Sequence, residues 1–510
     1  MIYYMAGVLA VAAIAVGVVL AGANDDVQRY HQHLQRPSEA ELGDCSTCTA
    51  DALCTHLPLM IIDTFSAEIP GRPVGFGTSD ASREYITTPE GETEIEVSVL
   101  VIDNQDDWNH ASDTPAHESL AMMRIRGNSS RFFDKPNYRI RLIEPNEEDN
   151  HLPLLGMSAH SEWSLHGPFL DKTLMRNYIW MNIAAEVMGP GHFVPEVRFF
   201  ELILNGEYQG VYVLMETIRV NPNRVDLNRY RQGMPATSYL VRLNTFTHTP
   251  ERKVNTFVTY TYRLEGGNTL EILYPRRNQQ SDSVRDYVAR SISRVERLLY
   301  SPDILWSSRE YERYIDVDSF MNFYIINEFI ANNDLWAGST YFHKDVRGRL
   351  IAGPVWDFNN VMDNFFLTMP ADEFLLADRG WFDRLMICPR FTDQVIRRWR
   401  TLRRGVLAEE RLVSYMQETE AWLGSAIARN FEVWGYSFDP SQLSLMARRR
   451  PTYAQAQAGY TIYDVNPESF EQAQEWARDY MITRGRWLDD YIETLRQFSH
   501  SSRHASWVLQ

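Results

Sequence analysis

The sequence has few cysteines, no excess of basic residues, and no internal repeat or low-complexity tract. Four cysteines in 510 residues are too few for a scaffold built on disulfides. A net charge of −17 excludes the basic footprint of a general nucleic-acid coat, although it leaves room for a local basic pocket. With 44% hydrophobic and 23% charged residues, the chain is not a wholly disordered one. Its length suggests about three domains, or two lobes that share one cleft.

One long apolar run stands at the N-terminus. From Ile2 to Ala23 no residue carries a formal charge, and most are Ala, Val, Ile or Leu. At about 1.5 Å per residue, a helix of this length spans the roughly 30 Å hydrocarbon core of a bilayer. Residues 1–24 therefore predict a signal anchor that holds the rest of the chain outside the cytoplasm. Ala21-Gly22-Ala23 resembles a processing site, so a cleaved signal peptide and a secreted chain are the alternative.

Three of the four cysteines cluster in residues 25–57, a polar stretch that we expect to be a linker. Cys45-Ser-Thr-Cys48 is followed by Cys54 and then His56. These side chains could hold Zn²⁺ through thiolates and imidazole, or form a local disulfide with a spare thiol in an oxidising compartment. The spacing of paired ligands usual in zinc fingers is absent, which favours the disulfide.

The remaining chain divides into two parts of different character. Residues 58–220 contain alternating apolar segments, a hairpin signal at Asn205-Gly206, and a helical pattern from Leu174 to Met188. Residues 221–510 have mainly helical spacing, interrupted by two short strand patterns within residues 339–356. We therefore predict an α+β enzyme with a β-rich N-lobe, a mainly helical C-lobe and a cleft between them.

Two aspartates flank the predicted hairpin of the second part. Asn332-Asn333-Asp334 precedes the hairpin, and Trp356-Asp357-Phe358-Asn359 follows it. A short hairpin can bring both carboxylates to one edge of the cleft. One acid could then accept a hydroxyl proton while the other holds Mg²⁺ against phosphate oxygens. Taken by spacing alone, aspartates at the ends of a hairpin are more often residues that cap turns, which is the alternative.

Basic side chains form two further candidate groups. One occupies alternating positions on two strands and consists of Arg124, Arg126, Arg139 and Arg141. Lys135 lies between these strands, and the backbone of residues 127–130 could face anionic oxygens. The second group, Lys172 and Arg176, shares one helical face. Both groups could cradle phosphates, or they could be a solvated charged face and surface ion pairs, for example with Glu186.

Taken together, the motifs resemble the CotH family, whose members are spore-coat-associated and secreted atypical protein kinases. The residues that carry the resemblance run in order over roughly residues 58–365: Arg124 to Ser130, Lys135, Asp171-Lys172, Arg176-Asn177, Asn205 to Tyr212, Glu216 and Trp356-Asp357-Phe358. The resemblance implies a divergent, bilobal protein-kinase-like fold that uses ATP with Mg²⁺, or Mn²⁺. It also implies phosphorylation of Ser or Thr in proteins of the cell surface or spore coat.

The resemblance further implies roles for single residues. Asp334 corresponds to the catalytic aspartate, and Asp357 to the metal-binding aspartate. Lys135 and the strand of Arg124 and Arg126 fall where the family binds nucleotide phosphates. The two basic groups add Arg139, Lys172 and Arg176 as further candidate phosphate ligands. The strand end at Met215 and Glu216 resembles a kinase hinge, where backbone groups would meet adenine, although Glu216 could instead pair with a cation. The glycine-rich signature of ordinary kinases is absent, as it generally is in this family.

One residue departs from the family pattern. The family commonly has Trp-Asp-x-Asp, and here the fourth residue is Asn359. An amide oxygen can ligate Mg²⁺ but brings no charge to offset the ion. Asn360 or Asp363 could compensate. The alternative function is therefore a catalytically impaired, kinase-like scaffold protein of the cell or spore surface.

Overall fold

A computed structural model describes residues 29–48, 53–75, 84–234, 236–244, 253–258, 269–301, 304, 309–335, 338–364 and 369–499. The chain divides into two units, Met1–Tyr30 and His31–Gln510, and the account below concerns the second. The predicted signal anchor or signal peptide in residues 1–24 lies outside the described residues. Within the described ranges, no helix has the length and apolar character needed to span a bilayer.

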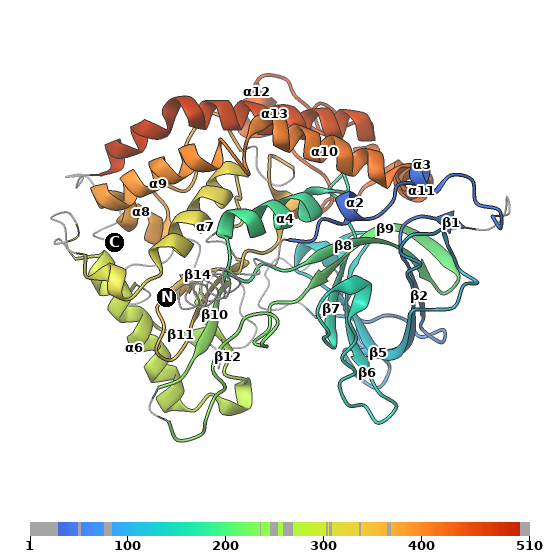
Figure 1. The fold of residues 1–510 in the computed structure, drawn as a ribbon, viewed down its shortest axis with the longest axis horizontal. Helices are drawn as coiled ribbons and strands as arrows, with labels where there is room; N and C mark the ends of the chain where they lie inside the picture. Colours follow the sequence, from blue (N-terminus) through green and yellow to red (C-terminus); the bar gives the residue numbers. More distant parts are fainter. Residues whose placement is uncertain are drawn as a thin grey trace, which may run out of the picture. The chain divides into compact units, whose positions relative to one another are not determined.

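Seven strands close into a barrel (Figure 1). Around the barrel, the strands follow the order β2 (Leu59–Asp63), β3 (Ile95–Ile102), β5 (His117–Arg126), β6 (Asn137–Ile143), β7 (Glu162–His166), β9 (Glu207–Glu216) and β8 (Val197–Leu204). Each neighbouring pair is antiparallel except β2 and β8, whose parallel pairing closes the ring. Apolar side chains fill the interior, among them Val97, Ile140, Trp163 and Leu214.

The mixed α+β class is confirmed, and its β-rich part has a more specific form than predicted. A bilobal protein-kinase-like fold is not established by these elements, because the β-rich part is a closed barrel. The hairpin at Asn205-Gly206 joins β8 to β9 as expected, and both residues have positive φ, at 52° and 79°. That backbone is typical of the tight turns whose twist matches the flanking strands.

A second sheet accounts for most of the strands outside the barrel. Its order is β11 (Lys253–Val254), β12 (Thr269–Tyr274), β10 (Tyr239–Asn244), β13 (Thr340–Lys344) and β14 (Leu350–Ala352). The β13–β14 hairpin is the one predicted from the sequence. The strands β10, β11 and β12 lie in the half predicted to be mainly helical, and we did not predict them.

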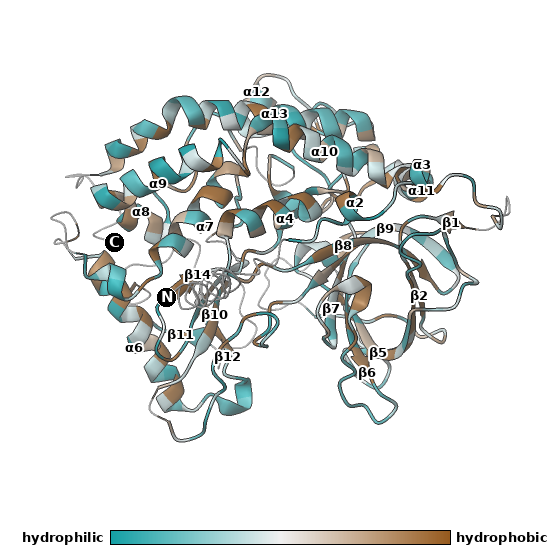
Figure 2. Cartoon of the chain, in the orientation of Figure 1, coloured by the Kyte–Doolittle hydropathy of each residue, from teal (hydrophilic) through white to brown (hydrophobic). Residues whose placement is uncertain are grey.

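Apart from α2 (Gln32–Gln35) and α3 (Glu39–Leu42), the described residues form nine α-helices. They are α4 (Arg176–Met188), α6 (Asp282–Leu299), α7 (Val317–Phe329), α8 (Gly380–Ile387), α9 (Pro389–Leu402), α10 (Glu409–Leu423), α11 (Ser425–Trp434), α12 (Tyr453–Gln457) and α13 (Phe470–Tyr491). Helices α4 and α7 are largely apolar and almost wholly buried (Figure 2). The other long helices are amphipathic, so they form the outer layer.

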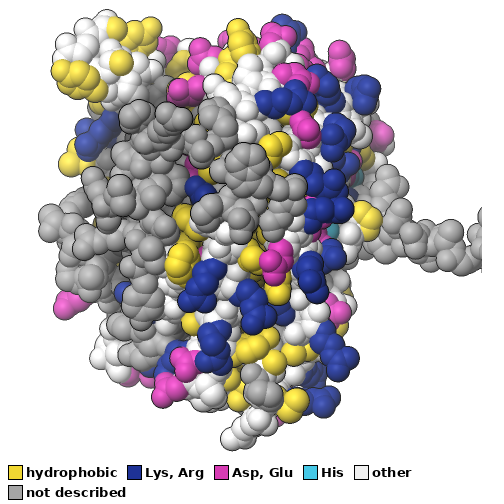
Figure 3. All heavy atoms as spheres, turned by 90° about the vertical axis from the view of Figure 1, so that its left-hand side faces the viewer, with side chains coloured by type: hydrophobic (Ala, Val, Ile, Leu, Met, Phe, Trp, Pro, Cys, Tyr) yellow, Lys and Arg dark blue, Asp and Glu magenta, His cyan; other side chains and the backbone are white. Residues whose placement is uncertain are grey.

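The face that carries α6, α8 and α9 is locally basic. Figure 3 shows Lys and Arg side chains gathered there in a band. Exposed members on these helices include Arg290, Arg297, Arg397 and Arg400. Charge is therefore distributed unevenly over the surface, although the net charge of the chain is negative.

A buried ion pair ties the last long helix to α7. Arg484 of α13 is 0% exposed and pairs with Glu328 near the end of α7. The carboxylate of Glu328 also accepts hydrogen bonds from the backbone N–H groups of Leu375, at 2.8 Å, and Leu376, at 2.9 Å. This pair anchors the C-terminal end of α7, just before the segment that contains Asp334.

Residues 31–42, part of the expected linker, pack closely on the rest of the fold as the helices α2 (Gln32–Gln35) and α3 (Glu39–Leu42). Gln32 is 0% exposed, and its side-chain amide exchanges two hydrogen bonds with the backbone of Phe199 in β8, at 2.7 and 3.1 Å. His33 Nδ1 lies 2.8 Å from the hydroxyl of Tyr178 in α4. We call residues 31–42 the N-terminal strap.

Candidate active site

The β13–β14 hairpin brings Asp334 and Asp357 together, and hydrogen bonds join the two segments that carry them. The side-chain amide of Asn360 donates to Asp334 Oδ2 at 3.2 Å. The backbone N–H of Met362 donates to the carbonyl of Ile330 at 2.8 Å. The end of α7 is therefore joined directly to the turn after β14.

The two carboxylates perturb each other electrostatically. Burial and the neighbouring charge of Asp357 raise the pKa of Asp334 to about 6, against the hydrogen bond from Asn360. Burial also raises the pKa of Asp357, although the charge of Arg126 and the hydroxyl of Ser339, at 3.2 Å, act in the opposite direction. Paired, largely desolvated carboxylates with raised pKa values are typical of proton-transfer and cation-binding sites.

Next to the pair lies a buried oxygen that lacks a donor. Asn359 Oδ1 accepts no hydrogen bond within the described residues, while its Nδ2 donates to Asn360 Oδ1 at 3.1 Å. Leaving a buried acceptor unsatisfied costs about 1–3 kcal/mol. Carboxylate and amide oxygens are the ligands that Mg²⁺ prefers. Asp357 and Asn359 therefore offer the kinds of oxygen atom that a hard divalent cation binds.

The backbone at Asp357 is also unusual. Its φ of 69° and ψ of 58° are left-handed, a conformation that costs a non-glycine residue roughly 1 kcal/mol or more. Neighbouring side chains hold it there. Asn177 Oδ1 accepts the backbone N–H of Phe358 at 2.9 Å, and Arg176 Nε donates to the carbonyl of Val361 at 3.1 Å. Both residues belong to the first turn of α4, so this helix positions the turn that carries Asp357.

Arg176 is therefore placed as a positioning residue. Asp171 pairs with its guanidinium, and Asp171 Oδ2 accepts its backbone N–H at 2.8 Å. Asp171 thus holds the first residue of the helix, which ends at Met188 as predicted. Asn177 belonged to the motif that carries the family resemblance, but we had not counted it among the site residues.

Of the four strand arginines, Arg126 lies at the aspartates. It donates to Ser164 Oγ at 2.8 Å, its guanidinium lies 5.4 Å from the ring centroid of Trp356, and the charge of Asp357 acts on it. The other three are paired with acids on the barrel: Arg124 and Arg139 with Glu94, Arg139 also with Glu162, and Arg141 with Asp149. A charged stripe therefore runs along the outer face of the barrel strands away from Asp357.

The ammonium groups of Lys135 and Lys172 both donate hydrogen bonds to other groups of the protein. Lys135 is 1% exposed, and its Nζ donates to the carbonyl of Val211 at 2.7 Å and to Asn430 Oδ1 at 2.6 Å. Lys172 Nζ donates to the carbonyl of Phe169 at 2.6 Å and to Ser437 Oγ at 2.7 Å. Burial lowers the pKa of both, in Lys172 to about 7. These contacts join the barrel side to α11 and the turn after it, and the structure does not bring Lys135 to the aspartates.

Met215 and Glu216 end the strand from which the chain leaves the barrel. Met215 is buried and pairs with Ser164 on one side and Val197 on the other. Glu216 Oε2 accepts the backbone N–H of Glu196 at 2.9 Å, and its other oxygen lies 3.6 Å from Arg224 Nε. The alternative that Glu216 pairs with a cation therefore agrees with the structure.

A wide cleft of about 970 Å³ opens where the chain leaves β9. Its walls come from the start of β7, from residues 218–222 and 226–230, and from the end of β12. Glu162 lines the cleft and pairs with Arg139, so the charged stripe on the barrel reaches this space. Arg219, Arg229 and Arg276 also line it.

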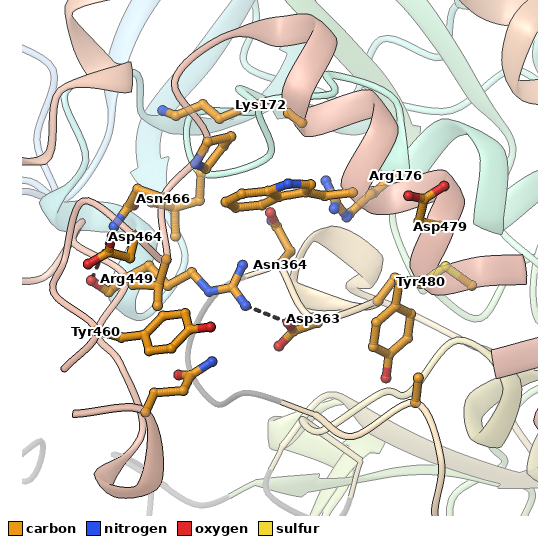
Figure 4. Close-up of a pocket in the computed structure, with 18 of the residues that line it drawn as sticks. Lys172, Arg176, Asp363, Asn364, Arg449, Tyr460, Asp464, Asn466, Asp479 and Tyr480 are labelled. Carbon is orange, nitrogen blue, oxygen red and sulfur yellow. Dashed lines mark hydrogen bonds and ion pairs between the residues drawn. The ribbon is translucent and has the colours of Figure 1, made fainter. Parts of the chain in front are cut away.

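A smaller pocket of about 390 Å³ lies beside the turn that follows Asp357. Figure 4 shows Lys172 and Arg176 at its edge, and Arg449 directed at Asp363. Arg449 Nη2 lies 2.5 Å from Asp363 Oδ2, and Asp363 Oδ1 accepts the backbone N–H of Met369. Asp363 is thus engaged by Arg449 rather than directed toward Asn359.

Comparison with known proteins agrees with the motifs in the sequence. The model of the CotH kinase protein family matches residues 123–488, which include both aspartates, Arg126, Asn359 and the first turn of α4. No curated protein matches the chain. Since the family model covers well over half of the sequence, the chain belongs to the CotH kinase family.

Proposed function

We propose that the protein is an atypical protein kinase that transfers the γ-phosphoryl group of ATP to Ser or Thr hydroxyls of proteins at the cell surface or spore coat. The observation that supports this most directly is the shared site of Asp334 and Asp357, with the unsatisfied oxygen of Asn359 and the guanidinium of Arg126 beside it. Family membership makes kinase chemistry the expected use of such a site.

Each residue has a defined part in this proposal. Asp334, with a pKa of about 6, is largely ionised at neutral pH and accepts the proton of the attacking hydroxyl. Asp357 and Asn359 would hold the Mg²⁺, or Mn²⁺, which when bound offsets negative charge on the phosphate oxygens. Arg126 stabilises charge that develops on the transferred phosphoryl group. The new bond forms between the acceptor oxygen and the γ-phosphorus, and ADP leaves.

The wide cleft is the proposed nucleotide site. It adjoins the chain segment that follows Met215 and Glu216, where the hinge of a kinase would lie, and the charged stripe on the barrel connects it with Arg126. We therefore place the base and ribose in this cleft and the phosphates along the stripe, toward Asp357.

The cellular setting follows from the N-terminal apolar run. We propose that residues 2–23 anchor the chain in a membrane or direct its export, so that the kinase acts outside the cytoplasm. ATP is scarce outside most membranes. A spore or forespore compartment would supply it.

The test measures transfer of label from γ-labelled ATP, with Mg²⁺ or Mn²⁺, to the protein itself and to a serine-rich protein. Wild type is compared with Asp334→Asn and Asp357→Asn, and with Asp286→Asn on the exposed face of α6 as the matched control. We expect transfer by wild type and the control only, with the label recovered as phosphoserine or phosphothreonine. Equal transfer by all four proteins would refute the assigned roles.

Asn359 supports a second candidate, a kinase-like scaffold protein without turnover. This protein would bind nucleotide in a metal-dependent way and transfer no label. Metal-dependent binding of a fluorescent ATP analogue, combined with no transfer under either metal, would favour the scaffold.

A further inference from the structure

A second cluster of metal-binding side chains lies on the N-terminal side of the barrel, away from the aspartates. The ligand atoms of Cys45, Cys48, Cys54 and His110 all lie within 4.8 Å of one another. The four residues come from three places in the chain. Cys45 and Cys48 follow α3, Cys54 begins β1 (Cys54–Thr55), and His110 ends β4 (Asn109–His110), in the connection between β3 and β5.

Backbone pairing sets this arrangement. Strands β1 and β4 form a separate two-stranded sheet, in which Cys54 lies directly opposite His110. A sheet of two such short strands is marginal by itself, so another link must hold it in place. The convergence of four side chains at one end of this sheet is the obvious candidate for that link.

The histidine is oriented as a metal ligand would be. His110 Nε2 lies 3.4 Å from Cys45 Sγ and 3.5 Å from Cys48 Sγ. Its other ring nitrogen, Nδ1, lies 3.3 Å from Asp113 Oδ2, and the same carboxylate accepts hydrogen bonds from His110 N and Asn104 Nδ2. A carboxylate behind the imidazole is the usual way in which proteins fix the ring and tautomer of a histidine ligand.

In the structure Cys48 and Cys54 form a disulfide, and Cys45 is a thiol. The disulfide involves only Cys48 and Cys54, and it does not explain why Cys45 and His110 lie beside them. A tetrahedral zinc ion employs all four, since three thiolates and one imidazole are a common structural ligand set. Thiolate-rich sites favour zinc over Mg²⁺ or Ca²⁺.

We propose that, with its thiols reduced, the chain binds one structural Zn²⁺ through Cys45, Cys48, Cys54 and His110. His56, the histidine of the sequence motif, is not part of the cluster: its Nδ1 lies 3.3 Å from Glu39 Oε1 and its ring packs against Trp422. The family match begins at residue 123, so all four ligands lie before the matched region.

The position of the site indicates what it stabilises. It lies where the N-terminal strap enters the barrel, and Arg36 of the strap pairs with Asp103 at the base of the connection that carries His110, at 2.6 Å. Trp422 Nε1 of α10 donates to the carbonyl of Arg36 at 3.1 Å. The zinc ion would therefore fix the strap to the barrel at one end, while contacts with the helices fix the other.

The test measures the metal content of the purified full chain, kept in a phosphine reductant and dialysed against Zn²⁺ and then against metal-free buffer. We expect one equivalent of zinc in wild type and in Cys388→Ser, whose thiol is buried elsewhere. Cys45→Ser and His110→Ala should each lose most of it. Less than half an equivalent in wild type, or full retention by both ligand variants, would overturn the proposal.

A second measurement on wild type alone covers the case in which the variants fail to fold. Replacing zinc by Co²⁺ should give the intense visible bands of a tetrahedral ion and the near-ultraviolet bands of cobalt–thiolate bonds. An octahedral, weakly absorbing spectrum would contradict the site. Thiol titration adds an independent check on zinc-loaded protein from which the phosphine has been removed in air before unfolding in chelator. Four thiols are expected if zinc holds the cysteines, whereas two, Cys45 and Cys388, would show that the disulfide is the stable state and would contradict the site.

Discussion

Replacing Asp334 by Asn should make the metal-free protein more stable at alkaline pH, although it abolishes phosphoryl transfer. Burial and the charge of Asp357 raise the pKa of Asp334 from 3.8 to about 6. The folded state therefore binds this proton more tightly than the unfolded state. Tighter binding of this proton adds to the free energy of unfolding. This added stability is complete at low pH, falls as the pH rises from about 4 to about 6, and is absent above that range.

The size of the effect follows from the shift. Each pKa unit corresponds to 1.36 kcal/mol, so the ionised carboxyl destabilises the fold by about 3 kcal/mol at pH 8, an upper value because the residue is partly exposed. Asn keeps an oxygen that can accept the hydrogen bond from Asn360. For a cooperative unit of about 480 residues, an unfolding entropy of about 2.1 cal/mol/K per residue converts this energy to a rise in Tm of up to about 3 °C.

Differential scanning calorimetry in a chelator, at pH 8 and pH 4.5, measures the change. We expect Asp334→Asn to melt above wild type at pH 8 and to lose most of this advantage at pH 4.5. Asp286→Asn, on the exposed face of α6, should differ little from wild type at either pH. A Tm of Asp334→Asn below that of wild type at pH 8, or the same difference at both pH values, would refute the electrostatic account of the pair.

Three further substitutions test the surroundings of the site. Asn359→Asp adds a negative charge to the proposed metal ligands. It should lower the Mg²⁺ concentration for half-maximal activity roughly tenfold, which corresponds to about 1.4 kcal/mol in binding free energy. A metal titration of activity measures this midpoint, and an unchanged midpoint would argue against a ligand role. Arg126→Met removes the cation that lowers the pKa of Asp357, so the acid limb of the kcat/KM profile should move to higher pH. Arg484→Met leaves a buried glutamate unpaired and should lower the free energy of unfolding by about 3–5 kcal/mol in a denaturant titration. Arg486→Met, at an exposed pair, should leave the free energy of unfolding nearly unchanged in the same titration.

The features that could be predicted from the sequence depend on local chemistry. The turn at Asn205-Gly206 needs two residues that tolerate positive φ, and both signals stand next to each other in the chain. Helix α4 ends at Gly189 because glycine accepts the positive φ of 78° found there. Asp334 and Asp357 meet because one short hairpin separates them. Each prediction required only a short, continuous stretch of the chain.

The features that escaped prediction depend on partners far away in the chain. The parallel pairing of β2 with β8 closes the barrel, and no local sequence pattern predicts this pairing. Lys135 looks like a phosphate ligand beside its neighbours in sequence, but its amide partner Asn430 lies on α11. His110, rather than His56, approaches the cysteines because β1 pairs with β4. Alternation and spacing do not encode such long-range pairings.

Closure of the barrel has a consequence for how this protein is divided into pieces. The family match begins at residue 123, inside β5, so a fragment trimmed to the match would lack β2, β3 and the first half of β5. Strand β8 would then lose its parallel partner, and β6 would keep only part of its neighbour. Two open edges would replace a ring that had none, and exposed edges recruit strands from other molecules. The region matched by the family model is thus shorter than the piece of chain needed to close the barrel.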